Sequence, residues 1–121
     1  MTYVDGFVIP IPKKNLATYK KMAAGGAKVW KKHGALEYFE CVGDDLFPKM
    51  PGMKIAQFPT LTKAKAGETV VFSFIVYKSK AHRNAVNKKV MKEMNEKAPP
   101  QTMPFDMKRM AYGGFKTIVQ A

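Results

Sequence analysis

The chain has 121 residues, of which 46% are apolar and 25% charged, and its formal net charge at pH 7 is +12. A chain of this length and composition is typical of one globular domain with its own hydrophobic core, so we expect a single domain over residues 1–121. Its apolar runs are no longer than strands, and its N-terminus lacks a basic segment followed by an apolar one, which argues against a membrane span and a secretory signal. One cysteine fits a reducing compartment, and we expect a cytoplasmic protein.

The first part of the chain predicts a strand, a helix and a second strand. Residues 3–9 alternate in the manner of a strand, which Pro10 and Pro12 are expected to end because proline donates no hydrogen bond to a sheet. Residues 13–32 predict a helix, since apolar side chains recur there at helical spacing. This apolar stripe consists of Leu16, Tyr19, Ala23, Ala27 and Trp30. Residues 35–42 predict a strand with mixed faces, which is typical of a position near a sheet edge.

The region from residue 46 to residue 68 predicts a long loop excursion. It contains three prolines and two glycines and shows no sustained hydrophobic period. A loop of this length inside a compact domain usually carries a function or is disordered.

The remainder of the chain predicts a buried central strand, a helix and a last strand. In residues 70–77, seven of the eight side chains are β-branched or aromatic, and such a run is too apolar for an exposed edge. Ser79 then offers a hydroxyl oxygen that can cap a helix over residues 80–95. Asp106 is expected to order the turn before a last strand at residues 109–119 by bonding to the backbone.

This order of elements predicts an α+β fold. A chain that runs strand, helix, strand, loop, strand, helix, strand follows the ferredoxin-like βαββαβ pattern, with a four-stranded antiparallel sheet and two helices on one face. The other sheet face is then apolar and uncovered, which is unusual for a soluble monomer. We therefore expect a homodimer in which two sheets meet face to face as a dimeric α/β barrel.

Strand alternation leaves two ways to assign the faces of this sheet. We expect the helices to cover the more continuous apolar set, which consists of Val4, Val8, Phe72, Phe74 and Val76. The opposite face would then carry Asp5 and Ser73 into the dimer interface. A buried carboxylate or hydroxyl must be hydrogen-bonded, hydrated or used, so a cavity between the sheet faces is the expected site.

Four stretches of the chain are similar to one known family. They are residues 1–10, 30–42, 76–83 and 103–115, and the last of them, MPFDMKRMAYGGF, is the most specific. The chain resembles the YbaA-like family, domain of unknown function 1428, nearly from end to end. The resemblance implies a dimeric α/β barrel, and it implies no particular activity.

The candidates for a small-molecule site are polar side chains expected to converge on an apolar cavity, which is how such sites are usually built. They are Asp5, Glu40, Ser73, Tyr77, His82 and Tyr112. Four of them also have a structural interpretation. Asp5 can pair with a cation, for which Arg109, Lys108 and His82 are available, and the tyrosines can be rim packing. His82 is either a packed histidine or an acid–base or anion-contact group.

The sequence argues against a metal site and against a nucleotide cofactor. Two distant histidines and one cysteine lack metal-ligand spacing, and no glycine-rich phosphate loop is present. We therefore expect no cofactor.

Three functional hypotheses remain. The leading one is a homodimer that binds or converts a small molecule, and the sequence leaves open whether the protein is an enzyme. The second is RNA binding through the lysine-rich helix at residues 13–32, and the third is a non-catalytic structural dimer. All but two of the 21 cationic side chains are lysines, which predicts that any contact with nucleic acid is weak, salt-sensitive and independent of sequence.

Overall fold

The structure is a computed structural model that describes residues 1–97 and 102–121. Its strands are β1 (Tyr3–Pro12), β2 (Glu37–Val42), β3 (Glu68–Tyr77) and β4 (Ala111–Lys116). Its helices are α1 (Leu16–Lys32), α2 (Phe58–Leu61) and α3 (Lys80–Lys97), and η1 (Lys13–Asn15) and η2 (Met107–Arg109) are short 3-10 turns. The strands form one antiparallel sheet in the order β2-β3-β1-β4, which confirms the predicted α+β class and four-stranded sheet. Within the described ranges, none of the helices has the length and hydropathy needed to cross a bilayer.

Strand β1 continues through the two prolines that were expected to end it. Pro10 and Pro12 still pair with β3, whereas the pairing with β4 stops at Val8. Beyond Val8 the β4 side of β1 is an open edge, where a missing N–H costs no sheet hydrogen bond. The prediction of a strand end was wrong because the sequence does not show how far the neighbouring strand reaches.

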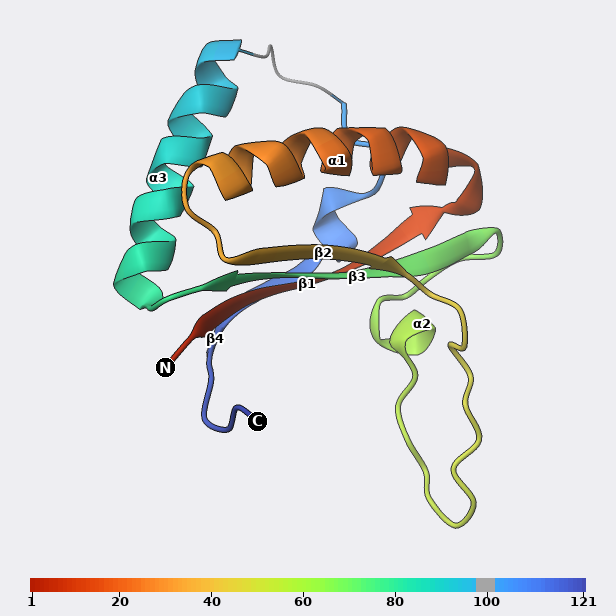
Figure 1. Ribbon diagram of the computed structural model, residues 1–121. Coiled ribbons are helices and arrows are strands. Elements are labelled where there is room, and N and C mark those ends of the chain that lie inside the picture. Colours follow the sequence, from red (N-terminus) through yellow and green to blue (C-terminus); the bar gives the residue numbers. More distant parts are fainter. Residues whose placement is uncertain (98–101) are drawn as a thin grey trace.

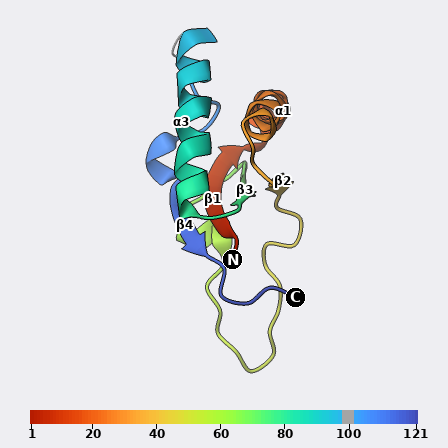
Figure 2. The same ribbon diagram turned by 60° about the vertical axis from the view of Figure 1, so that its left-hand side comes forward.

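Helices α1 and α3 lie on the same side of the sheet, as Figures 1 and 2 show. The main core clusters beneath them consist of Ile9, Ile11, Tyr19, Ala23, Val71 and Phe105, and of Ala35, Ile75, Tyr77, Val86 and Val90. The Ser79 hydroxyl accepts a hydrogen bond from the backbone N–H of His82 at 3.1 Å, which confirms the predicted cap of α3.

The face assignment made from the sequence is wrong. The helices cover the face that carries Asp5 and Ser73, which are 1% and 3% exposed, together with their apolar neighbours. Phe72, expected beneath the helices, is 45% exposed on the opposite face. Both alternating sets are largely apolar, so alternation alone did not distinguish them; packing against the helices decided the orientation.

We call the uncovered side of the sheet the bare face. Its side chains are Val4, Val8, Phe39, Cys41, Phe72, Phe74, Val76 and Phe115, which share one face by register. Phe39 and Phe74 stack across strands with ring centroids 4.9 Å apart. Cys41 is exposed here.

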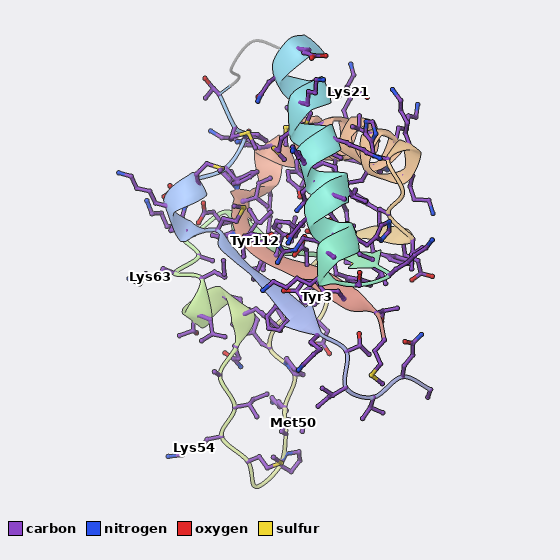
Figure 3. The ribbon with its side chains drawn as sticks, turned by 90° about the vertical axis from the view of Figure 1, so that its left-hand side faces the viewer. Tyr3, Lys21, Met50, Lys54, Lys63 and Tyr112 are labelled. Carbon is purple, nitrogen blue, oxygen red and sulfur yellow. The ribbon has the colours of Figure 1, made fainter. Side chains whose placement is uncertain are left out.

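The segment between β2 and β3 projects on the bare-face side. Figure 1 shows it hanging below the sheet with α2 in its returning arm, and Figure 3 shows Met50 and Lys54 far from the sheet. Phe58 of α2 meets the edge of Phe72 with ring centroids 6.2 Å apart. The segment therefore shields one end of the bare face and leaves the rest open.

A buried ion pair joins η2 to the start of β3. Arg109 donates two hydrogen bonds to the Glu68 carboxylate, at 2.7 and 2.8 Å, and the Glu68 side chain is only 7% exposed. Hydrogen bonds from Arg109 lower the pKa of Glu68 to about 2. The Asp106 side chain accepts from the Lys108 backbone N–H at 3.0 Å, which confirms the predicted aspartate turn, and it also accepts from Arg109.

We expect the ion pair between Glu68 and Arg109 to make the free energy of unfolding depend on pH in the acidic range. The pKa of Glu68 is lowered from 4.5 to about 2, so the ionised carboxylate stabilises the fold above about pH 4.5 and this contribution is lost as the pH falls towards 2. Urea unfolding of Glu68→Gln should give a free energy of unfolding lower by roughly 1–3 kcal/mol at neutral pH. The variant should also lose less stability than the wild type on acidification.

The control is Glu96→Gln, which changes an exposed carboxyl on α3. It should follow the wild type at every pH. If Glu68→Gln and the wild type lost stability in parallel on acidification, the ion pair would not be the source of the acid dependence.

Candidate functional site

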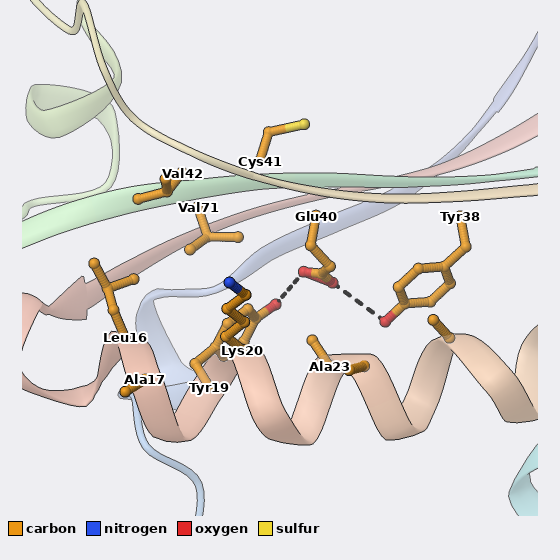
Figure 4. A pocket seen from close by; sticks show the side chains of 12 residues that line it. Leu16, Ala17, Tyr19, Lys20, Ala23, Tyr38, Glu40, Cys41, Val42 and Val71 are labelled. Carbon is orange, nitrogen blue, oxygen red and sulfur yellow. Dashed lines mark hydrogen bonds between the residues drawn. The ribbon is translucent and has the colours of Figure 1, made fainter.

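The Glu40 carboxylate lies between β2 and α1, held by two phenol groups. The Tyr19 hydroxyl donates to Oε2 at 2.6 Å and the Tyr38 hydroxyl donates to Oε1 at 3.2 Å (Figure 4). Tyr38 and Glu40 are two residues apart on β2, so both face the helix, while Tyr19 comes from the apolar stripe of α1. Ser73 of β3 is the cross-strand partner of Glu40.

Partial burial is the main influence on the pKa of the Glu40 carboxyl group. Glu40 sits on an edge strand and remains accessible to solvent, but its carboxylate is turned towards the helix. Burial raises the pKa of Glu40, and hydrogen bonds from the hydroxyls of Tyr19, Tyr38 and Ser73 oppose that rise. The pKa values of Tyr19 and Tyr38 are also raised, first by burial and then by the adjacent carboxylate. Both phenols therefore stay protonated and act as donors.

Two open cavities meet at Glu40. The smaller has a volume of about 580 Å³ and lies between the first turns of α1 and β2, with Lys20 and Cys41 among its lining residues. The larger has a volume of about 700 Å³ and extends beneath α1 towards α3. Tyr19, Ala23, Tyr38 and Glu40 line both cavities. The larger cavity is also lined by methionines and by aromatic rings, namely Met22, Met91, Met94, Met103, Met110, Phe7, Trp30 and Phe105.

A second polar cluster surrounds Asp5 near the other end of the sheet. Arg83 of α3 places Nε 3.2 Å from Asp5 Oδ1, and the Tyr112 hydroxyl donates to the same oxygen at 3.2 Å. Nε is close enough for an ion pair but makes no hydrogen bond of good angle in the described part of the chain. The Arg83 guanidinium also donates to the Tyr3 hydroxyl at 3.1 Å and lies over the Tyr3 ring. Tyr3 and Tyr112 are labelled in Figure 3.

Gly114 allows this close approach. A Cβ at that position would collide with the Tyr3 ring and hydroxyl and with the Arg83 guanidinium. Gly114 therefore marks a close approach of side chains to the backbone of β4.

Tyr77 and His82 lie beside the Asp5 cluster but play structural parts. Tyr77 is fully buried and donates to Asn87 at 3.1 Å, and burial, followed by the charge of Asp5, raises its pKa. His82 accepts the backbone N–H of Lys78 at Nδ1, at 3.0 Å, and packs edge-on against the Tyr77 ring. His82 therefore orders the start of α3.

The six candidates thus fall into separate places. Glu40 and Ser73 reach the cavities, and Asp5 and Tyr112 belong to the cluster around Arg83. Tyr77 lies beside that cluster and donates to Asn87, and His82 stands at a helix start. Sequence reasoning missed Tyr19, Tyr38 and Arg83. The spacing of Tyr38 and Glu40 on one strand was a usable signal for the first site. Arg83 carried no such signal, because its contact with Asp5 is long-range.

No group of three or more histidine, cysteine, aspartate or glutamate side chains arranged to hold a metal ion occurs within residues 1–97 and 102–121.

Comparison with known proteins places the chain in a family. The family described as "Protein of unknown function (DUF1428)" matches residues 2–107. The chain belongs to the DUF1428 family. It is 44% identical over 119 residues to "Uncharacterized protein YbaA" of Escherichia coli (strain K12), with 98% of each chain covered, and the relative with the same description in Shigella flexneri gives the same values. Among solved structures, "De novo designed protein Foldit4" aligns over 99% of this chain and 100% of its own, with a TM-score of 0.44 and 12% identity.

We expect the charge of Asp5 to be structural. Asp5→Asn leaves the largely buried Arg83 without a counter-charge, and breaking a buried pair in this way typically costs about 3–5 kcal/mol. The free energy of unfolding, measured with urea, should therefore fall by roughly that amount. The double variant Asp5→Asn with Arg83→Met removes both charges and should recover part of the loss.

The matched control is Asp45→Asn, which changes an exposed carboxylate after β2 and should leave the free energy of unfolding near the wild-type value. An Asp5→Asn protein as stable as the wild type would contradict a structural role and return Asp5 to the candidate site.

Proposed function

We propose that this DUF1428 protein binds a small molecule in the two cavities between α1 and the sheet. The observation that carries the proposal is the Glu40 carboxylate, held by two phenols where the cavities meet. Ligand sites are typically concave, largely apolar and equipped with a few well-placed polar groups, and they usually enclose roughly 300–1,000 Å³. Volumes of about 580 and 700 Å³ lie in that range.

Conversion of the bound molecule would use the same carboxylate. A carboxyl with a raised pKa is a better general base than an ordinary one, and burial raises the pKa of Glu40. The hydroxyls of Tyr19 and Tyr38 fix the carboxylate orientation, since each donates to a different oxygen. The function proposed is ligand binding. If the protein also converts its ligand, Glu40 is the group that would abstract a proton from it.

The binding proposal predicts saturable uptake of a neutral apolar dye. Nile red should bind at micromolar concentration with a rise in fluorescence. Ala23→Leu should weaken that binding by about tenfold or more, because Ala23 lines both cavities and a larger side chain fills the space where they meet.

The matched control is Ala85→Leu, an exposed position on α3 that lines neither cavity, and it should bind the dye as the wild type does. Dye binding that Ala23→Leu leaves unchanged would place the dye elsewhere, for instance on the bare face, and would refute the proposed site.

The same protein is proposed to be a homodimer through its bare face. The strand order β2-β3-β1-β4 with α1 and α3 on one side supports a ferredoxin-like domain spanning residues 1–121, and two such sheets meeting face to face would make a dimeric α/β barrel. The paired rows of the bare face carry two formal charges, those of Glu37 and Glu68 at its ends, and Glu68 is paired with Arg109, although the chain has a net charge of +12. Two copies of this face can therefore meet without opposing lysines.

Projecting segments add to the surface that a second copy would cover. The loop after β2 and the C-terminal tail both extend on the bare-face side (Figures 1 and 2). Their exposed apolar side chains are Phe47, Met50, Met53, Ile55, Ile118 and Val119. Stable interfaces bury roughly 800 Å² per partner, and these side chains enlarge the apolar surface that the sheet alone offers.

The dimer proposal predicts a sedimenting mass of twice the 13.6 kDa chain at micromolar concentration. Phe72→Lys places a charge at the centre of the bare face and should shift the protein to monomer, because burying an unpaired charge is costly. Met107→Lys, at a position 50% exposed in η2, should remain dimeric. A wild-type protein that sediments as a compact monomer would refute the proposal.

Nucleic-acid binding is not favoured as a second function. The lysines of α1 are exposed, as Lys21 in Figure 3 illustrates, and supply charge without base recognition. The aromatic residues of the same helix are engaged elsewhere, since Tyr19 donates to Glu40 and Trp30 donates to Asn87. The expectation of weak, sequence-independent binding stays a prediction.

A further inference from the structure

The charge balance of the larger cavity indicates what kind of molecule it accepts. Of the described residues that line it, only Glu40 carries a formal charge. Lys20 lines the neighbouring cavity, but its side chain is exposed and no ion pair between Lys20 and Glu40 occurs in the described part of the chain. Removing the remaining water from a carboxylate that has no counter-charge costs free energy. A ligand that fills this cavity must therefore compensate the negative charge of Glu40.

The hydrogen bonds at Glu40 fit its ionised form. Both carboxylate oxygens accept from phenol hydroxyls, at 2.6 and 3.2 Å, and Ser73 faces the same carboxylate from β3. An ionised carboxylate only accepts hydrogen bonds, whereas the neutral acid would need an acceptor for its own proton. These hydroxyl groups fix the position of the ionised Glu40 carboxylate, but they carry no positive charge that would neutralise it.

The walls of the cavity suit an organic cation. The rings of Tyr19, Trp30 and Tyr38 line it, and aromatic faces attract ammonium groups more strongly once water is displaced. Trp30 and Tyr38 are neighbours, with ring centroids 5.9 Å apart. Five methionine side chains also line the cavity, and their thioethers are polarisable and adapt to the shape of an apolar ligand.

We propose that the cavity selects protonated organic amines, with the ammonium group bound to Glu40 and an aromatic or aliphatic body lying among the methionines. This inference rests on the proposed small-molecule function and names its ligand class. An anionic ligand would meet the Glu40 charge with no cation in the larger cavity to offset it. A neutral ligand would leave that charge unpaired.

The test compares three probes of nearly equal shape by displacement of Nile red from the wild-type protein at neutral pH. Phenethylamine is a cation, phenethyl alcohol is neutral and phenylacetate is an anion. Phenethylamine should displace the dye at a concentration at least about tenfold lower than phenethyl alcohol, because a charge-assisted hydrogen bond to a carboxylate is stronger than a neutral one. Phenylacetate should be the weakest of the three.

Two variants test whether Glu40 causes the preference for the amine over the alcohol. Glu40→Gln keeps the size of the side chain and removes its charge, so the advantage of the amine over the alcohol should fall to within about twofold. Glu37→Gln changes a carboxylate of the same strand that lies on the opposite face, and the advantage should persist. Far-UV circular dichroism checks that both variants are folded.

The outcomes separate the ligand class from the binding function itself. Equal displacement by amine and alcohol, stronger displacement by phenylacetate, or no displacement by any probe from a protein that binds Nile red would overturn the amine proposal and leave the site intact. An amine preference that survives in folded Glu40→Gln would overturn it as well. If the wild type binds neither Nile red nor phenethylamine by calorimetry, the proposed function fails with it.

Discussion

The rest of the structure depends on the central antiparallel pair of β1 and β3, which is apolar on both faces. Their register runs without a break from Tyr3 opposite Tyr77 to Pro12 opposite Glu68. Helices α1 and α3 cover one face and bury the core there. The other face presents stacked phenylalanine rings with only α2 at one end. Since burial of apolar area is the dominant stabilising term, this uncovered face is the basis of the proposed homodimer.

Two carboxylates on the covered face differ in whether their charge is balanced within the fold. Asp5 is 1% exposed and has Arg83 and Tyr112 as partners, so its charge is balanced within the fold. Glu40 has hydroxyl donors but no cationic partner among the residues that the structure describes, and it borders a cavity. A balanced buried pair contributes to the folded state, whereas an unbalanced carboxylate beside a cavity is available to a bound molecule.

The positive charge of the surface and the negative charge of Glu40 in the cavity act on a ligand over different distances. A net charge of +12 carried mostly by lysine attracts anions to the outside of the molecule. At physiological ionic strength this field is screened within roughly 8 Å, so it does not set the chemistry of a cavity lined by methionine and aromatic side chains. Inside, the charge of Glu40 dominates because fewer water molecules and ions separate it from a ligand.

The sequence by itself determined the elements that arise from local interactions. It predicted the central strand β3, the Ser79 cap and the Asp106 turn, because each depends on neighbours along the chain. Glu40 and Ser73 could also be proposed from it, as polar positions in otherwise apolar strands. Only the tertiary structure decided which sheet face the helices cover, that Arg83 is the partner of Asp5, and that phenols from α1 and β2 hold Glu40. Those outcomes depend on contacts between residues far apart in the sequence, and strand alternation leaves them open because both faces are apolar.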